Sequence, residues 1–204
     1  MRISPFTLSG RHVSLVPLGR SHAQALHAAA ARERSTYGHT VVPADLAAME
    51  AYIDGLLQDA ERDIAVPFAQ VRASDHSPVG CTRFMNVLWW PGRGTPPEVE
   101  IGGTWLAADA QRSPINTEAK LMLLTHAFET WSVFRVALCT DAANTRSRDA
   151  IERIGASFEG VLRRHRPSAG HFGTPGEARD SAIFSITDHE WPSVRDRLQQ
   201  RLTG

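Results

Sequence analysis

The sequence has few cysteines, no excess charge of either sign and no long apolar run, and each shortage excludes a class of protein. Its two cysteines, Cys81 and Cys139, lie in stretches typical of strands, which predicts buried thiols rather than a disulfide framework. Lysine plus arginine number 22, and so do aspartate plus glutamate. Nucleic-acid binders usually carry a basic excess, so no nucleic-acid partner is expected.

Two further absences concern membranes and metals. No apolar run approaches ~18 residues and no signal-peptide pattern opens the chain, so we expect no membrane association and a cytoplasmic location. There is no C-x-x-C pair, and His126 with Glu129 has no evident third ligand, so no metal is expected.

The length and composition are those of one globular domain spanning residues 1–204. Apolar residues make up 42% of the chain and charged residues 22%, as in ordinary folded proteins. Residue periodicity predicts strands and helices in the order β-α-α-β-β-β-α-β-α-β-β-α. The predicted strands are 12–18, 66–72, 79–88, 98–106, 134–140, 158–163 and 181–186, and the predicted helices are 21–32, 45–60, 118–131, 144–154 and a C-terminal helix ending near residue 202. We therefore expect an α/β fold (α+β) with a mixed, mostly antiparallel sheet flanked by helices.

A strand, a short polar loop and a helix start follow one another between Ile101 and Ala119. Gly102 and Gly103 interrupt the strand, which predicts a bulge or a close backbone approach. A helix start presents free N–H groups and a positive dipole end, which can hold a pyrophosphate, and Arg112 would add a charged contact. A capped helix start without any ligand is the alternative interpretation, because neither a P-loop nor a G-x-G-x-x-G pattern is present.

A second helix start favours the ligand-binding interpretation over a capped helix without any ligand. Asn144 is a good N-cap, and Ser147 lies three residues later at the same helix mouth. If neighbouring parallel strands feed both helices, both mouths face one edge of the sheet. The crevice at the carboxyl ends of such strands is where ligands bind.

Residues 98–156 resemble the core of the GNAT acetyltransferases, in particular the branch that contains the ribosomal-protein N-terminal (alanine) acetyltransferases. The matching marks are Leu8-x-Gly10-Arg11-x-x-x-Leu15-x-Pro17-Leu18, Glu100-Ile101-Gly102, Asn144-x-x-Ser147, and Arg179-Asp180 with Phe184-Ser185-Ile186 and Glu190-Trp191. Single motifs are weak, but their order and spacing along the whole chain are specific. The resemblance implies an enzyme that transfers an acetyl group from acetyl-CoA to a primary amine, with acetyl-CoA as cosubstrate.

The resemblance also implies roles for individual residues. The pantetheine arm would lie beside the strand like an added strand. Its amides would pair with the backbone of Thr104, Trp105 and Leu106. Residues that would cradle the pyrophosphate are Arg112, Ser113, Pro114, Ile115, Asn116 and Thr117. At the second helix start, Asn144 would hydrogen-bond the arm, Ser147 would donate to the leaving thiolate, and Arg148 completes the set.

Two positions depart from the family pattern. Pro114 and Asn116 stand where its phosphate loop usually has glycine or alanine. Ile151 stands where many members have a tyrosine that acts as general acid, and Ser147 is the predicted substitute.

A general base must accept the amine proton, and the strand 98–106 offers two carboxylates. Glu98, Glu100 and Thr104 are expected on one face of that strand. Glu100 is the first candidate, acting directly or through a water, and Glu98 the second. A strand N–H near Thr104 or Trp105 would polarise the thioester carbonyl. The alternative is that Glu100 only anchors a neighbouring loop.

The sequence does not fix the acceptor. Protein N-terminal amines, amino acids, polyamines and drugs such as aminoglycosides stay open, and the loops 37–43, 88–97 and 164–179 are expected on the acceptor side. Relatives often dimerise, so a homodimer is a further possibility. The alternative function is a non-catalytic module that senses acyl-CoA or binds a partner on the same fold.

Overall fold

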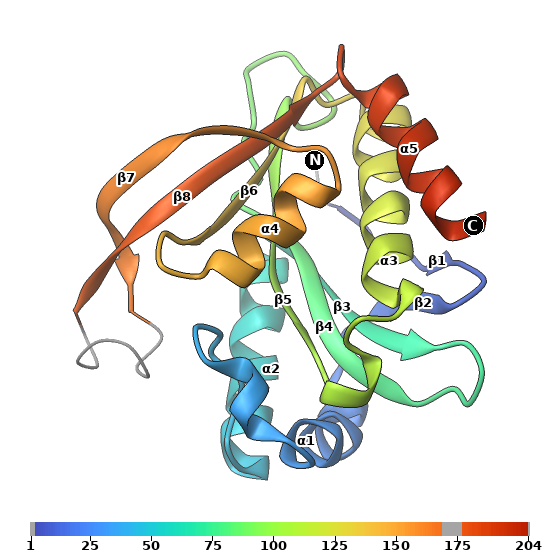
Figure 1. Cartoon of the computed structure of the whole chain (residues 1–204), viewed down its shortest axis with the longest axis vertical. Helices are drawn as coiled ribbons and strands as arrows, with labels where there is room; N and C mark the ends of the chain where they lie inside the picture. Colours follow the sequence, from blue (N-terminus) through green and yellow to red (C-terminus); the bar gives the residue numbers. More distant parts are fainter. Residues whose placement is uncertain (1–2, 169–176, 204) are drawn as a thin grey trace.

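The sheet is mixed and mostly antiparallel, as predicted. The computed structural model describes residues 3–168 and 177–203, and Figure 1 shows the chain trace. One sheet runs in the order β1-β2-β3-β4-β5-β6-β8-β7, and only the β5–β6 pair is parallel. The strands are β1 Leu8–Ser9, β2 Val13–Pro17, β3 Ala65–Arg72, β4 Pro78–Met85, β5 Glu98–Leu106, β6 Arg135–Asp141, β7 Ser157–Pro167 and β8 Ala178–Thr187.

Helices cover both faces of the sheet. They are α1 Ala23–Ala31, α2 Leu46–Glu61, α3 Pro114–Thr125, α4 Thr145–Arg153 and α5 Trp191–Thr203. One apolar core lies between the sheet and α3, α4 and α5, and a second lies between the sheet and α1 and α2. Figure 1 shows α3 and α5 side by side on one flank, with α1 and α2 together at the lower end. Within residues 3–168 and 177–203, no helix is long and apolar enough to cross a membrane.

Several element boundaries differ from the prediction. Helix α3 begins at Pro114 rather than at Glu118, because Ser113 is its N-cap and proline at the first position has no N–H to satisfy. It ends at Thr125 and continues as a π-helical turn through Thr130. Strands β7 and β8 are longer than predicted, so Arg164 and Arg166 belong to a strand and not to a loop. Residues 169–176 of the predicted acceptor-side loop lie outside the described part of the chain.

The N-terminal segment is fastened to α3 by one buried carboxylate. Glu118 accepts hydrogen bonds from the backbone N–H groups of Arg11, His12 and Val13, at 2.7, 2.6 and 2.9 Å. Gly10 lies against the same carboxylate, so closely that a Cβ there would overlap it. Glu118 therefore fixes α3 above β2, and the glycine of the opening motif has a packing reason.

Candidate functional site

The two parallel strands at the centre of the sheet separate after a short paired stretch. Register pairs join Glu98 to Arg135, Val99 to Val136 and Glu100 to Ala137, and they stop there. Strand β5 nevertheless continues to Leu106 and β6 to Asp141. The carboxyl-terminal halves of β5 and β6 are therefore not paired with each other. A ligand can lie between strands that separate in this way.

A helix begins close to the end of each diverging strand. Helix α3 follows β5, and the side chain of Ser113 accepts from Ile115 N–H at its start. Helix α4 follows β6, and Asn144 Oδ1 accepts from Ser147 N–H at 3.0 Å. The predicted N-cap role of Asn144 is confirmed. Because β5 and β6 are parallel neighbours, the two helix N-termini lie at the same edge of the sheet.

Side chains bridge the two helix starts. Arg146, in the first turn of α4, donates to Gln111 Oε1 at 2.5 Å and to the Thr36 carbonyl at 3.3 Å. Gln111 Nε2 in turn donates to Thr36 Oγ1 at 3.1 Å and to the Leu106 carbonyl at 2.8 Å. The segment before α2, the end of β5 and α4 are thereby tied together. The Leu106 backbone, predicted to pair with the pantetheine arm, thus accepts one hydrogen bond from Gln111 and keeps a second lone pair on its carbonyl oxygen.

The predicted bulge lies in β5. Thr82 on β4 faces both Gly103 and Thr104, and Gly103 has φ +57°, which favours glycine. Its open Cα position is covered by the Arg83 guanidinium, whose Cζ would stand 2.6 Å from a Cβ. The bulge therefore changes the side to which the following residues point.

This change makes one prediction wrong. Thr104 Oγ1 hydrogen-bonds Thr82 Oγ1 at 2.8 Å and accepts from Lys120 Nζ on α3 at 2.7 Å. Glu100 pairs in register with Met85, on the opposite face, the one covered by α1 and α2. Thr104 and Glu100 thus lie on different faces of the sheet, because the extra residue of the bulge reverses the alternation.

Glu100 is buried and fully engaged. Its carboxylate pairs with both terminal nitrogens of Arg166, at 2.8 and 2.6 Å, and accepts from Asn86 Nδ2 at 2.8 Å. The hydrogen bond from Arg166 to Glu100 raises the pKa of the guanidinium further. Glu98, the second candidate, is half-buried at the start of β5; its backbone carbonyl accepts from Leu88 N–H, and its carboxylate has no hydrogen-bond partner among the described residues.

The remaining predicted residues have simpler surroundings. Arg112 is exposed, has φ +55° and makes no side-chain bond to a described residue. Arg148 donates to the Ala142 carbonyl at 3.3 Å and lies over the Phe158 ring, so its guanidinium is directed towards β7. Four residues of the predicted pyrophosphate loop lie in the first turn of α3 and not in a loop: Pro114, Ile115, Asn116 and Thr117. Trp105 and Leu106 are buried.

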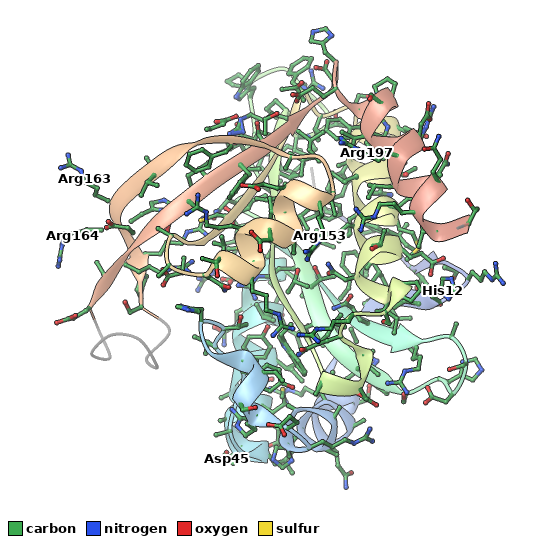
Figure 2. The ribbon with its side chains drawn as sticks, viewed as in Figure 1. His12, Asp45, Arg153, Arg163, Arg164 and Arg197 are labelled. Carbon is green, nitrogen blue, oxygen red and sulfur yellow. The ribbon has the colours of Figure 1, made fainter. Side chains whose placement is uncertain are left out.

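Other candidate surfaces add little to this edge of the sheet. Figure 2 shows Arg163 and Arg164 projecting outward from β7, where a shallow open hollow also includes His165 and Asp180. None of these residues is among those predicted to bind the cosubstrate. In the described ranges, no group of three or more His, Cys, Asp or Glu residues is placed to hold a metal ion.

Sequence reasoning missed three polar residues near this edge: Arg146, Arg166 and Lys120. Arg146 lies between the two predicted residues Asn144 and Ser147, and its position was a usable signal. Arg166 stands 66 residues from Glu100, and nothing local in the sequence links the two. Lys120 sits inside a helical run where a charged residue normally faces solvent.

Known proteins share this architecture. Residues 12–157 match the Acetyltransferase (GNAT) domain family. A stretch of 89 residues is 35% identical to the "Putative ribosomal N-acetyltransferase YdaF" of Bacillus subtilis (strain 168), covering 44% of this chain and only 45% of that protein. A GCN5-related N-acetyltransferase from Brucella melitensis superposes with a TM-score of 0.82 at 28% identity, over 99% of this chain and 87% of that one. RimJ of Mycobacterium smegmatis, solved in complex with CoA-disulfide, has the same fold, with a TM-score of 0.74 at 24% identity over 93% of this chain and 88% of its own.

The matched family region includes both diverging strands and both helix N-termini. The resemblance drawn from the motifs is thereby confirmed, and the chain belongs to the GNAT acetyltransferase family.

Proposed function

We propose that this protein transfers the acetyl group of acetyl-CoA to a primary amine by direct attack, with the whole chain 1–204 acting as one domain. The observation that carries the proposal is the separation of β5 from β6 beyond Glu100, with a helix N-terminus at the end of each strand. An extended molecule with amide groups can pair with the free edge of a strand, and a helix N-terminus favours a phosphate. Pantetheine and pyrophosphate supply these two groups in one molecule.

The proposed cosubstrate site uses the residues at this edge. The backbone of β5 after the bulge would pair with the pantetheine arm, and Asn144 would donate from Nδ2, because its Oδ1 already caps α4. The pyrophosphate would meet the first turn of α3, where Arg112 is exposed and free to approach it. The residues proposed there are Arg112, Ser113, Pro114, Ile115, Asn116 and Thr117. At α4, Ser147 and Arg148 complete the set.

The reaction forms a C–N bond and breaks a C–S bond. The neutral amine attacks the thioester carbonyl carbon, the thiolate leaves, and the amine proton passes to a base. We propose Glu100 as that base, reached through a water because its oxygens are held by Arg166 and Asn86, with Glu98 as the second candidate. A β5 N–H near Thr104 or Trp105 would stabilise the oxyanion, and Ser147 would donate to the thiolate.

A second candidate is a non-catalytic acyl-CoA sensor or interaction module. Two observations favour it: Glu100 is neutralised in an ion pair, and Ile151 is a buried core residue where a general acid would be expected. The proposed enzyme needs neither a free Glu100 oxygen nor a strong acid, because a thiolate is already a good leaving group. The two functions differ in turnover and not in binding.

Thiol release from acetyl-CoA separates them. The purified protein would be assayed with a panel of amines that includes peptides with free N-termini, amino acids, polyamines and aminoglycosides. Release above the amine-free rate with any one acceptor supports the enzyme. Tight CoA binding by calorimetry without release supports the sensor, and absence of binding contradicts both.

Protein N-terminal amines are the acceptors that we would test first. YdaF, which resembles this chain over part of its length, is described as a "Putative ribosomal N-acetyltransferase". A homodimer and a cytoplasmic location stay predictions from the sequence.

A further inference from the structure

Lys120 is the only lysine of this chain, and it is buried. The sequence has 22 lysines and arginines, and all of them except Lys120 are arginines. Lys120 lies on α3 and is 7% exposed. Its Nζ donates to Thr104 Oγ1 at 2.7 Å, and the described residues offer it no carboxylate. A charged group in this position is unusual, because buried charges are normally paired.

Keeping this amine inside the protein costs stability. Burial lowers the pKa of Lys120 from 10.5 to about 7, since an ammonium is poorly solvated there. Apolar side chains of similar shape avoid this cost, and replacing buried ions by them is often stabilising. Nearby Ala119, Leu123 and Leu124 on α3 belong to the apolar core. A residue that lowers stability without a structural need calls for a functional reason.

The contacts of Lys120 lead to the proposed cosubstrate site. Thr104 Oγ1 also bonds Thr82 Oγ1 at 2.8 Å, so a line of three side chains runs from α3 to β4. Thr104 is the residue directly after Gly103 in the bulge, and it lies beyond the last β6 pair. Its side-chain hydroxyl links Thr104 to α3 through Lys120.

We propose that Lys120 is a positioning residue for acetyl-CoA, because it holds Thr104 and thereby the β5 backbone in the orientation that pairs with the pantetheine arm. This inference rests on the proposed function. It assigns to Lys120 an effect on cosubstrate affinity, transmitted through one hydroxyl, and no contact with the reacting atoms. Stability and affinity should then respond to loss of the amine in opposite directions. A purely structural lysine would lower both when removed.

Four variants test the inference with coenzyme A as the probe. Lys120→Met removes the amine and keeps the length of the chain, and Thr104→Val removes the hydroxyl with little change of shape. Thr104→Ser keeps the hydroxyl and is the matched control. The double variant combines Lys120→Met with Thr104→Val. Calorimetry gives the Kd for coenzyme A, and thermal unfolding without ligand gives Tm.

We expect Lys120→Met to bind coenzyme A about tenfold more weakly, the change that loss of one hydrogen bond produces, and to unfold about 10 °C higher than the wild type at pH 6. Thr104→Val should show a similar loss of affinity, and Thr104→Ser should bind like the wild type. Because both substitutions break the same connection, the double variant should lose no more than either single one. In steady-state assays the loss should appear as an increase in KM for acetyl-CoA.

Three outcomes would overturn the inference while leaving the proposed function intact. They are wild-type affinity in Thr104→Val, equal losses in Thr104→Val and Thr104→Ser, and a fall of both Tm and affinity in Lys120→Met. If Lys120→Met does not fold, the comparison of the two Thr104 variants still decides, because neither alters α3. A wild-type protein that binds no coenzyme A contradicts the proposed function itself.

Discussion

Glu100 and Arg166 form a two-point ion pair between β5 and β7, although 66 residues separate them in the sequence. The Glu100 carboxylate side chain is 6% exposed and the Arg166 side chain 24%. Such a pair has a planar, fixed geometry, so it orients the carboxylate as well as neutralising it. A base held in this way can accept a proton only through a water or after Arg166 moves.

Glu100→Gln tests the role of this carboxylate. We expect turnover to fall at least tenfold while the Kd for acetyl-CoA changes less than about twofold, because the substitution removes a proton acceptor away from the proposed arm site. Arg166→Met is the matched variant, since it breaks the same ion pair and keeps the carboxylate. If both variants lose turnover equally, Glu100 is an anchor for β7 and not a base.

Asn144 should bind the cosubstrate through its amide nitrogen. Asn144→Ala loses both the helix cap, worth about 1 kcal/mol, and the proposed donor, so stability and coenzyme A affinity should both decrease. Asn144→Asp keeps an oxygen for the Ser147 N–H, loses the donor, and adds a negative charge at the start of α4 that favours the helix cap and disfavours an anionic ligand. It should therefore retain the wild-type Tm and still bind about tenfold more weakly in calorimetry. Wild-type affinity in Asn144→Asp would remove Asn144 from the binding set.

Gly10→Ala should destabilise the fold. The new Cβ would displace the Glu118 carboxylate and weaken three backbone hydrogen bonds, at a cost of about 2 kcal/mol. Gly55→Ala on α2 is the control: nothing lies within 4 Å of its Cβ position, so it should gain up to about 1 kcal/mol. Urea unfolding measures both changes. Equal stabilities for the two variants would show that Gly10 is not packed against Glu118.

His126 should make the fold sensitive to weak acid. Its ring stacks on Phe6 with centroids 4.0 Å apart and contacts Trp131, and burial lowers its pKa to about 4 from 6.5. Between these values the unfolded chain binds a proton that the folded chain does not, so the stability falls as pH decreases from 6.5 to 4. His126→Phe should reduce this loss by about 2 kcal/mol. Parallel pH profiles of the two proteins would contradict the assignment.

Lys120 predicts a second pH window, at neutral to alkaline pH and with the same sign as that of His126. The unfolded chain holds the lysine proton up to 10.5, and the folded chain releases it near 7, so the stability rises with pH between those values. The advantage of Lys120→Met over the wild type should therefore be about 4 kcal/mol at most at pH 6 and shrink towards pH 10. Unfolding by urea at a series of pH values measures the difference. A constant difference would place the amine in contact with solvent.

The sequence predicted the fold well because periodicity and caps act locally. The glycine pair predicted the β5 bulge, and Asn144 predicted the start of α4. The same reasoning placed Thr104 on the wrong face, because one extra residue reverses the alternation and its exact position depends on Thr82 across the strand. The partner of Glu100 and the burial of Lys120 depend on chain segments distant in sequence, so periodicity carried no information about them.

The brief contact between β5 and β6 divides the sheet into two halves that share only three residue pairs. A bound molecule lying between β5 and β6 would act as a ninth strand and join the two halves into one continuous sheet. Amide hydrogens on both flanking strands should then exchange with solvent more slowly when the site is filled, so that ligand binding would be recorded on β6 and β8 as clearly as on β5.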